Sequence, residues 1–156
     1  MEIERKFLVA QLPLDLNKYP YKKIVQGYLA ISEDGTEVRI RQKGADFFET
    51  VKRGGGLTRA EYEIEIEHYQ FDSLWPVTEG KRIEKTRYEI EHEGRVVELD
   101  IYLGNLSGLQ VVEVEFSSEE ESKRYNIPDW FGEEITDDKR YKNQSLALYG
   151  LPGRRQ

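Results

Sequence analysis

Five segments of the chain alternate between hydrophobic and charged residues with a period close to two. They span residues 2–7, 37–41, 61–67, 97–101 and 112–116. The third of them reads Glu-Tyr-Glu-Ile-Glu-Ile-Glu. Such alternation is typical of β-strands whose two faces meet different surroundings. Each segment is therefore predicted to be a strand with one apolar and one charged face.

The remaining elements follow from shorter signals. Further strands are expected near residues 22–31, 46–53 and 81–92, and short helices near 69–76, 118–125 and 138–149. Turn sequences separate the strands: Glu33-Asp34-Gly35, Lys43-Gly44-Ala45, Gly54-Gly55-Gly56 and Glu93-Gly94. Pro76 is expected to end the first helix, and Gly150 with Pro152 the last. About eight strands with few helices predict a mainly β (α+β) fold, with a closed or nearly closed antiparallel sheet.

The charged faces consist almost entirely of ionic residues, and their signs are grouped. Basic positions are Arg39, Arg41, Lys52, Lys85 and Arg87; acidic positions are Glu61, Glu63, Glu65, Glu98, Asp100, Glu113 and Glu115. Each strand alone has an ordinary alternative, a charged face that meets solvent. Like charges two residues apart repel, however, unless an opposite charge lies between them.

We therefore expect the charged faces to point inward. In such a lumen, carboxylate pairs would bind hard divalent cations, and arginine and lysine would hold phosphate oxygens. The apolar faces would point outward, covered by the helices or by a second subunit. A Glu61–Glu65 face lying in bulk solvent would contradict this arrangement.

The composition limits the kinds of binding partner that the protein can have. The 156 residues, expected to form one domain over 1–156, include 30 acidic and 23 basic residues, for a net charge of -7. This balance argues against binding nucleic acid or an anionic membrane surface. Cysteine is absent, which excludes thiolate metal sites. No apolar run approaches the roughly 18 residues of a membrane span, so a cytoplasmic location is expected.

The segment Glu2-Ile3-Glu4-Arg5-Lys6 resembles the Glu-x-Glu-x-Lys signature of the CYTH superfamily, the triphosphate tunnel metalloenzymes. The further motifs follow in the family's order: Arg39-x-Arg41, Lys52, Glu61-x-Glu63, Lys85-x-Arg87, Glu98-x-Asp100 and Glu113-x-Glu115. With Asp138-Lys139-Arg140-Tyr141, the series covers nearly the whole chain. The sequence looks most like the short bacterial members that consist of the catalytic domain alone.

The resemblance implies a closed, eight-stranded antiparallel tunnel that binds a triphosphate with Mg²⁺ or Mn²⁺. It implies metal-side carboxylates at Glu2, Glu4, Glu113 and Glu115, with additional lumen acids at Glu61 and Glu63. The implied phosphate clamp is Lys6, Arg39, Arg41, Lys52, Lys85 and Arg87. The resemblance also implies that the C-terminal helix closes one mouth of the tunnel near Lys139 and Arg140. It supports a family role for Asp100 less strongly than for the residues above.

Lys85 and Tyr28 match a lysine–tyrosine pair proposed, in some short members, to generate the nucleophilic water. Among other cations, Lys85 would have a lowered pKa and serve as a base. The alternative is that Tyr28 is only a lumen or core aromatic. His68 and His92 have no ligand spacing and are expected to be surface or loop residues.

The leading functional prediction is hydrolysis of inorganic tripolyphosphate to pyrophosphate and phosphate. Adenylate cyclase and thiamine triphosphatase use the same kind of tunnel and stay open as alternatives. A polyphosphate-binding module without catalysis is a further alternative, although both glutamate pairs favour an enzyme. A homodimer is possible because an inverted barrel has an apolar exterior to cover.

Overall fold

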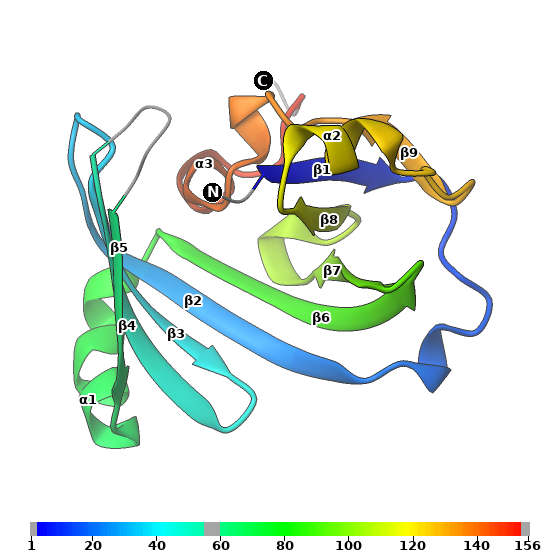
Figure 1. Ribbon diagram of the computed structural model, residues 1–156. Helices are drawn as coiled ribbons and strands as arrows, with labels where there is room; N and C mark the ends of the chain where they lie inside the picture. The colour runs from blue at the N-terminus through cyan, green and yellow to red at the C-terminus, as the bar shows by residue number, and fades with distance from the viewer. Residues whose placement is uncertain (1–2, 55–59, 154–156) are drawn as a thin grey trace.

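The computed structural model describes residues 3–54 and 60–153, and its nine strands form one antiparallel sheet (Figure 1). The strands are β1 (Ile3–Val9), β2 (Tyr21–Ile31), β3 (Glu37–Lys43), β4 (Asp46–Arg53), β5 (Ala60–Ile66), β6 (Arg82–His92), β7 (Arg95–Tyr102), β8 (Gln110–Phe116) and β9 (Phe131–Glu134). Their order across the sheet is β5-β4-β3-β2-β6-β7-β8-β1-β9. The predicted mainly β, antiparallel architecture is confirmed.

The register gathers the charged residues on one face of the sheet. Lys6 of β1 pairs with Glu113 of β8, and Arg87 of β6 pairs with Asp100 of β7. Directly paired residues point to the same side of a sheet. That face, the inner face, continues through Gln26 and Tyr28 of β2, Arg39 and Arg41 of β3, Lys52 of β4, and Glu61 and Glu63 of β5.

The prediction of a closed eight-stranded barrel is wrong. Within the described residues, no backbone ladder joins β5 to β1, and the curved sheet stays open between them (Figure 1). The outer edge of β1 is already used, because β9 pairs with it at Phe7 and Val9. The backbone of Lys6 also bonds to Ile135 and Thr136, which follow β9. With that edge occupied, β5 has no partner strand across the opening.

The helical segments are short. They are α1 (His68–Leu74), α2 (Glu119–Arg124) and α3 (Asn143–Tyr149), with 3₁₀ turns η1 (Leu16–Lys18), η2 (Trp75–Thr78), η3 (Gly104–Leu106) and η4 (Lys139–Tyr141). The first helix ends at Leu74, just before Pro76, as predicted, and Pro76 lies in the first turn of η2, where a missing N–H costs nothing. Gly150 does end the last helix, with φ 81°. Across the described residues, no helix has the length and apolarity needed to cross a membrane.

The outer face of the sheet is apolar, and the rest of the chain covers most of it. Phe7, Val112 and Val114 belong to one cluster with Tyr125 and Phe131, from the segments around α2 and β9. At the other end of the sheet, α1 packs Phe71 against Ile40 and Phe47. Figure 1 shows α2 and β9 beside β1, and α1 beside β4. The predicted outward apolar faces are confirmed on both sides.

The helix α3 lies over the opening of the curved sheet, between its two walls (Figure 1). Its Leu146 packs against Ile83, Val111 and Ile135, at one end of the inner face. The inner face is therefore apolar at the end that α3 covers and charged elsewhere. This division places a polar cavity beside the first turn of α3.

Candidate active site

A cavity of about 480 Å³ lies on the inner face, between the wall formed by β6, β7, β8 and β1 and the wall formed by β3, β4 and β5. We call these the β8 wall and the β4 wall. The described residues lining the cavity include six carboxylates and six cations: Glu4, Glu37, Glu61, Glu98, Glu113 and Glu115, and Lys6, Arg39, Arg41, Lys52, Arg87 and Lys142. The remaining described lining is Tyr28, two glycines, Asn143 and Gln144.

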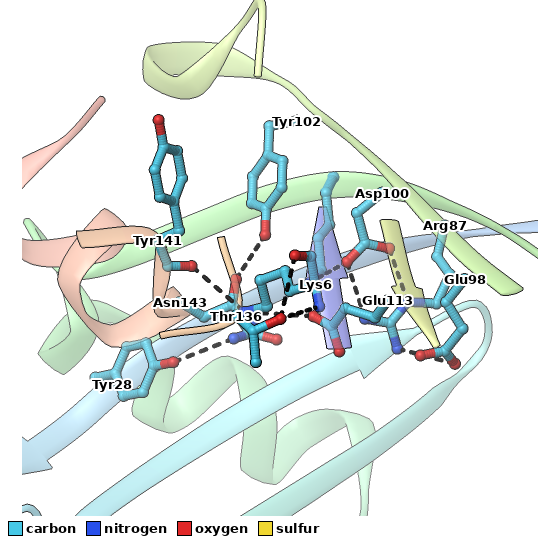
Figure 2. A network of polar contacts seen from close by, with 12 residues as sticks. Lys6, Tyr28, Arg87, Glu98, Asp100, Tyr102, Glu113, Thr136, Tyr141 and Asn143 are labelled. Carbon is cyan, nitrogen blue, oxygen red and sulfur yellow. Dashed lines mark hydrogen bonds and ion pairs between the residues drawn. The ribbon is translucent and has the colours of Figure 1, made fainter. Parts of the chain in front are cut away.

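The β8 wall is organised around a buried carboxylate, Asp100 (Figure 2). Arg87 donates to both of its oxygens, from Nε at 2.8 Å and from Nη2 at 2.9 Å. Lys85 Nζ lies 2.7 Å from Asp100 Oδ2, and Arg87 Nη1 is 3.5 Å from Glu98. Burial opposes ionisation of Asp100, but Lys85 and Arg87 outweigh it and hold the pKa of Asp100 well below its usual range. The carboxylate is therefore charged at neutral pH.

Lys85 lies behind the cavity and does not line it in the described structure. Its side chain is fully buried, with Nζ 5.3 Å from the centre of the Tyr102 ring. Burial lowers the pKa of Lys85 to about 8, although Asp100 acts in the opposite direction. The ammonium is thus held in the wall by one carboxylate, on the same sheet face as the cavity.

At the other side of the β8 wall, Glu4 lies directly opposite Glu115 and diagonally across from Glu113, which pairs with Lys6. Burial and the neighbouring Glu113 raise the pKa of Glu4 to about 8, even though Glu4 is partly open to solvent. Lys6 Nζ is 3.6 Å from Glu113 and helps keep that second carboxylate ionised, so its pKa is lowered. At neutral pH Glu4 therefore keeps a proton beside the ionised Glu113, in a site that also borders Glu115.

The chemistry of these acids fits a divalent metal. Carboxylate oxygens are the ligands that hard cations prefer. A cation bound between Glu4 and Glu113 would replace the proton that Glu4 carries. Within residues 3–54 and 60–153, however, no three carboxylate or imidazole groups already converge on one point. Glu2, the other predicted ligand on β1, lies outside the described residues.

The β4 wall differs from the β8 wall in how its charged groups are paired. Among the described residues, neither Arg39 nor Arg41 forms an ion pair, and the buried Nε of Arg39 has no hydrogen-bond partner. Arg41 donates Nε to the buried amide oxygen of Gln26, at 2.9 Å. Burial, followed by the charges of Arg39 and Arg87, lowers the pKa of Arg41 to about 10. Repulsion between these cations indicates that an anion is needed here.

The outer part of this wall is open. Glu61 lines the cavity and lies 3.6 Å from Lys52, yet its side chain is 53% exposed. Glu63 accepts a hydrogen bond from Thr50 at 2.8 Å and does not line the cavity in the described structure. Ala60 to Glu65 are all exposed. The charged face of β5 therefore points toward the cavity at Glu61 but remains exposed, because the sheet does not close over it.

The start of α3 joins both walls. Asn143 accepts a hydrogen bond from Tyr102 of β7 at 2.7 Å, and Gln144 donates to Glu37 of β3 at 3.2 Å. On the β1 side, Lys6 Nζ lies 3.5 Å from the Tyr141 carbonyl (Figure 2). The C-terminal helix thus borders the cavity, as the sequence predicted. Arg140 is instead paired with Asp138, and Lys142 lines the cavity.

Ten of the predicted site residues line one cavity: Glu4, Lys6, Tyr28, Arg39, Arg41, Lys52, Glu61, Arg87, Glu113 and Glu115. The sequence placed Glu98 on an acidic face and in a family motif without a specific role, and it did not single out Glu37, although both lie in the alternating segments. Asn143, Gln144 and Lys142 carried no such signal, because a short polar helix start looks the same on any surface. His68 is largely exposed and stacks on Phe47, and His92 contacts Tyr125, as expected of residues outside the site.

Relatives of the chain are known. No protein family model matches it. The chain is 53% identical over 149 residues to an inorganic triphosphatase of Nitrosomonas europaea, covering 94% of this chain and 97% of that protein. It is 36% identical to an inorganic triphosphatase of Acetivibrio thermocellus, covering 94% and 92%.

Solved structures agree on the fold. A crystal structure of an inorganic triphosphatase matches with a TM-score of 0.79 and 48% identity, covering 98% of this chain and 97% of that chain. A protein of Pyrococcus horikoshii matches with a TM-score of 0.55 at 18% identity, covering 80% and 84%, and this likeness supports the fold alone.

Proposed function

The chain belongs to the inorganic triphosphatases of the CYTH, or triphosphate tunnel, family, and we propose that it hydrolyses inorganic tripolyphosphate to pyrophosphate and phosphate in the cavity between its two walls. The charged lining of the cavity is the observation that favours tripolyphosphate as the substrate. Tyr28 contributes the one aromatic ring among the described lining residues, and no aliphatic side chain joins it. Such a lining suits a phosphate chain and offers little to stack on a purine or thiazole.

Phosphate binding falls mainly to the β4 wall. Arg39 and Arg41 form no ion pair within the described chain, so their guanidinium groups are available for bidentate contacts with phosphate oxygens. The buried Nε of Arg39 needs an acceptor, and a phosphate oxygen supplies one. Lys52 extends the clamp along the same wall, and Lys6 and Arg87 extend it on the β8 wall.

A divalent metal completes the charge balance. The described lining carries equal numbers of carboxylates and cations, so a bound triphosphate would leave the cavity strongly negative without further positive charge. Glu4, Glu113 and Glu115 would hold Mg²⁺ or Mn²⁺, with Glu2 as an additional ligand and Glu61 and Glu63 as candidates for a second ion. When bound, the metal supplies charge neutralisation at the phosphoryl oxygens.

We keep Tyr28 and Lys85 as the proposed catalytic pair. Tyr28 is the member that reaches the cavity, and Lys85 supports the wall behind it through Asp100. Replacing either Tyr28 by Phe or Lys85 by Ala is expected to lower kcat at least tenfold. Near-normal turnover in both variants would overturn this assignment, because the phosphate clamp and the metal alone would then account for the rate.

Several exposed apolar residues of the described chain are available to a second subunit, among them a pair on β5. Tyr62 and Ile64, on the outer face of β5, are 58% and 60% exposed. A homodimer that covers them stays a prediction, which sedimentation of the wild type and of Ile64→Lys would test.

A substrate panel tests the function. The wild type is incubated with Mg²⁺ or Mn²⁺ and tripolyphosphate, ATP, thiamine triphosphate or long-chain polyphosphate, and phosphate, pyrophosphate and cyclic AMP are quantified. We expect tripolyphosphate to have the highest kcat/KM, with pyrophosphate and phosphate released in equal amounts. Cyclic AMP from ATP as the main product would establish the cyclase instead. Tight binding without turnover of any compound would establish a binding module.

A further inference from the structure

Gln26 is fully buried on the inner face, at the centre of β2, and it does not line the cavity. It lies directly opposite Arg41 of β3 in the sheet register, and Tyr28 is two residues further along the same strand face. Cross-strand partners and residues at i+2 are the neighbours that a side chain can reach on one face. Gln26 thus contacts a cation of the phosphate clamp and the tyrosine that borders the substrate cavity.

Arg41 fixes the orientation of the Gln26 amide. A guanidinium group only donates hydrogen bonds, so the atom 2.9 Å from Arg41 Nε must be the amide oxygen. The amide nitrogen therefore points the other way, 3.3 Å from the Tyr28 hydroxyl oxygen, and donates to it. The usual ambiguity between the two ends of a glutamine amide is removed by its arginine partner.

The contact in turn directs the Tyr28 hydroxyl. Its oxygen accepts from Gln26, so its hydrogen must find an acceptor elsewhere. Within residues 3–54 and 60–153, no protein acceptor is bonded to that hydrogen, and the ring borders the cavity. Burial and the nearby Glu37 raise the pKa of Tyr28 to about 12, so the hydroxyl keeps its proton at neutral pH.

We propose that Gln26 is a positioning residue that links Arg41 to Tyr28 and holds the Tyr28 hydroxyl as a hydrogen-bond donor toward the triphosphate. This inference rests on the proposed function. A phosphate drawn in by Arg41 then meets a second, neutral donor whose direction is already set. Such preorganised donors act on charge that develops in the transition state, so the effect belongs mainly to kcat.

The alternative is that Gln26 only provides a hydrogen-bond acceptor for the half-buried Arg41. Gln26→Glu separates the two roles. A carboxylate still accepts from Arg41 Nε, but its second oxygen also accepts, so the Tyr28 hydroxyl turns inward to donate to it. A purely structural Gln26 predicts little change in kcat, whereas a positioning Gln26 predicts a loss.

We expect Gln26→Glu to lower kcat for tripolyphosphate by roughly 10- to 100-fold, the range for losing one hydrogen bond to a charged group, with KM changed less than about threefold. Tyr28→Phe should cause a similar loss, and the double variant should be no more than about twofold slower than Tyr28→Phe alone. Gln42→Glu on β3, where Gln42 donates to the Gly44 carbonyl, is the matched control and should retain wild-type kcat.

Gln26→Met is a second variant that keeps the inference testable if Gln26→Glu does not fold. It introduces no charge and leaves the Tyr28 hydroxyl undirected, so its kcat should fall about three- to tenfold, and this loss should disappear in the Tyr28→Phe background. Wild-type kcat in Gln26→Glu, or full additivity of either Gln26 variant with Tyr28→Phe, would overturn the inference alone. A wild type that leaves tripolyphosphate intact would overturn the proposed function and this inference together.

Discussion

The two walls of the cavity carry similar residue types but use them differently. On the β8 wall, Lys85 and Arg87 both pair with the carboxylate of Asp100 in a buried cluster. On the β4 wall, Arg39 and Arg41 form no ion pair within the described chain, and they repel each other. The buried cations of the first wall have a carboxylate of the protein beside them, whereas the two arginines of the second wall have none within the described chain. Similar residue types therefore form one wall held together by a buried ion-pair cluster and one wall whose arginines lack a carboxylate partner within the described chain.

The largest expected effect comes from breaking the β8 wall. Asp100→Asn keeps the shape of the side chain but leaves Lys85 buried without its counter-charge. Removing one partner of a buried ion pair costs about 3–5 kcal/mol of stability. Denaturant unfolding should show a loss of that size. Glu120→Gln is the control, because Glu120 and Arg124 form an exposed pair, and the cost should stay below about 1 kcal/mol. Equal losses in the two variants would contradict the account of this wall.

Breaking the β4 wall should have the reverse outcome. Arg39→Met removes the cation whose Nε has no partner, and it relieves the repulsion on Arg41. The free energy of unfolding should therefore change by less than about 1 kcal/mol, while kcat/KM for tripolyphosphate falls about 100-fold through lost charged hydrogen bonds. Arg124→Met, at an exposed position, is the control and should behave as the wild type. An active Arg39→Met would remove Arg39 from the clamp.

The metal side of the β8 wall predicts a pH effect. Glu4 holds its proton up to about pH 8 in the folded protein, against 4.5 ordinarily. The folded state then binds more protons than the unfolded state across that window, so the stability of the metal-free protein should fall as pH rises from 4.5 to about 8. Thermal unfolding in a chelator measures the slope. Glu4→Gln should reduce it, and saturating Mg²⁺ should do the same; an unchanged slope in Glu4→Gln would contradict the assignment.

The smallest effect is expected at the open edge. The ion pair between Lys52 and Glu61 is half exposed, and such pairs contribute about 0–1 kcal/mol. Glu61→Gln should therefore leave the free energy of unfolding within about 1 kcal/mol of the wild type. A larger loss in denaturant unfolding would show that β5 is held more tightly than its exposed residues indicate.

Most of the sheet and the ionic face could be predicted from the sequence, because a period of two assigns every residue to a face. The same parity could not show depth: Lys85 and Arg87 share a face, yet only Arg87 reaches the described cavity lining. The alternation of apolar and charged residues also could not predict whether the sheet closes into a barrel. Closure depends on which segment occupies the outer edge of β1, and the Phe-Gly-Glu-Glu segment that does so has no alternation.

The role of α3 could not be predicted from local sequence either. Asn143 and Gln144 take part in the site only because the chain returns from β9 and places them against Tyr102 and Glu37. Gln26 and Tyr28 lie two residues apart and so share a strand face, but the contact of Gln26 with Arg41 depends on the register between β2 and β3. Long-range pairing decided each of these positions.

The difference between the β8 wall and the β4 wall is tested most directly by the thermal shift that tripolyphosphate causes without metal. A ligand that binds only the folded state raises Tm. The wild type should show a clear rise, and Arg39→Met should start from a Tm near that of the wild type and show little rise at the same concentrations. A full rise in Arg39→Met, or a collapse of its Tm before any ligand is added, would contradict the account.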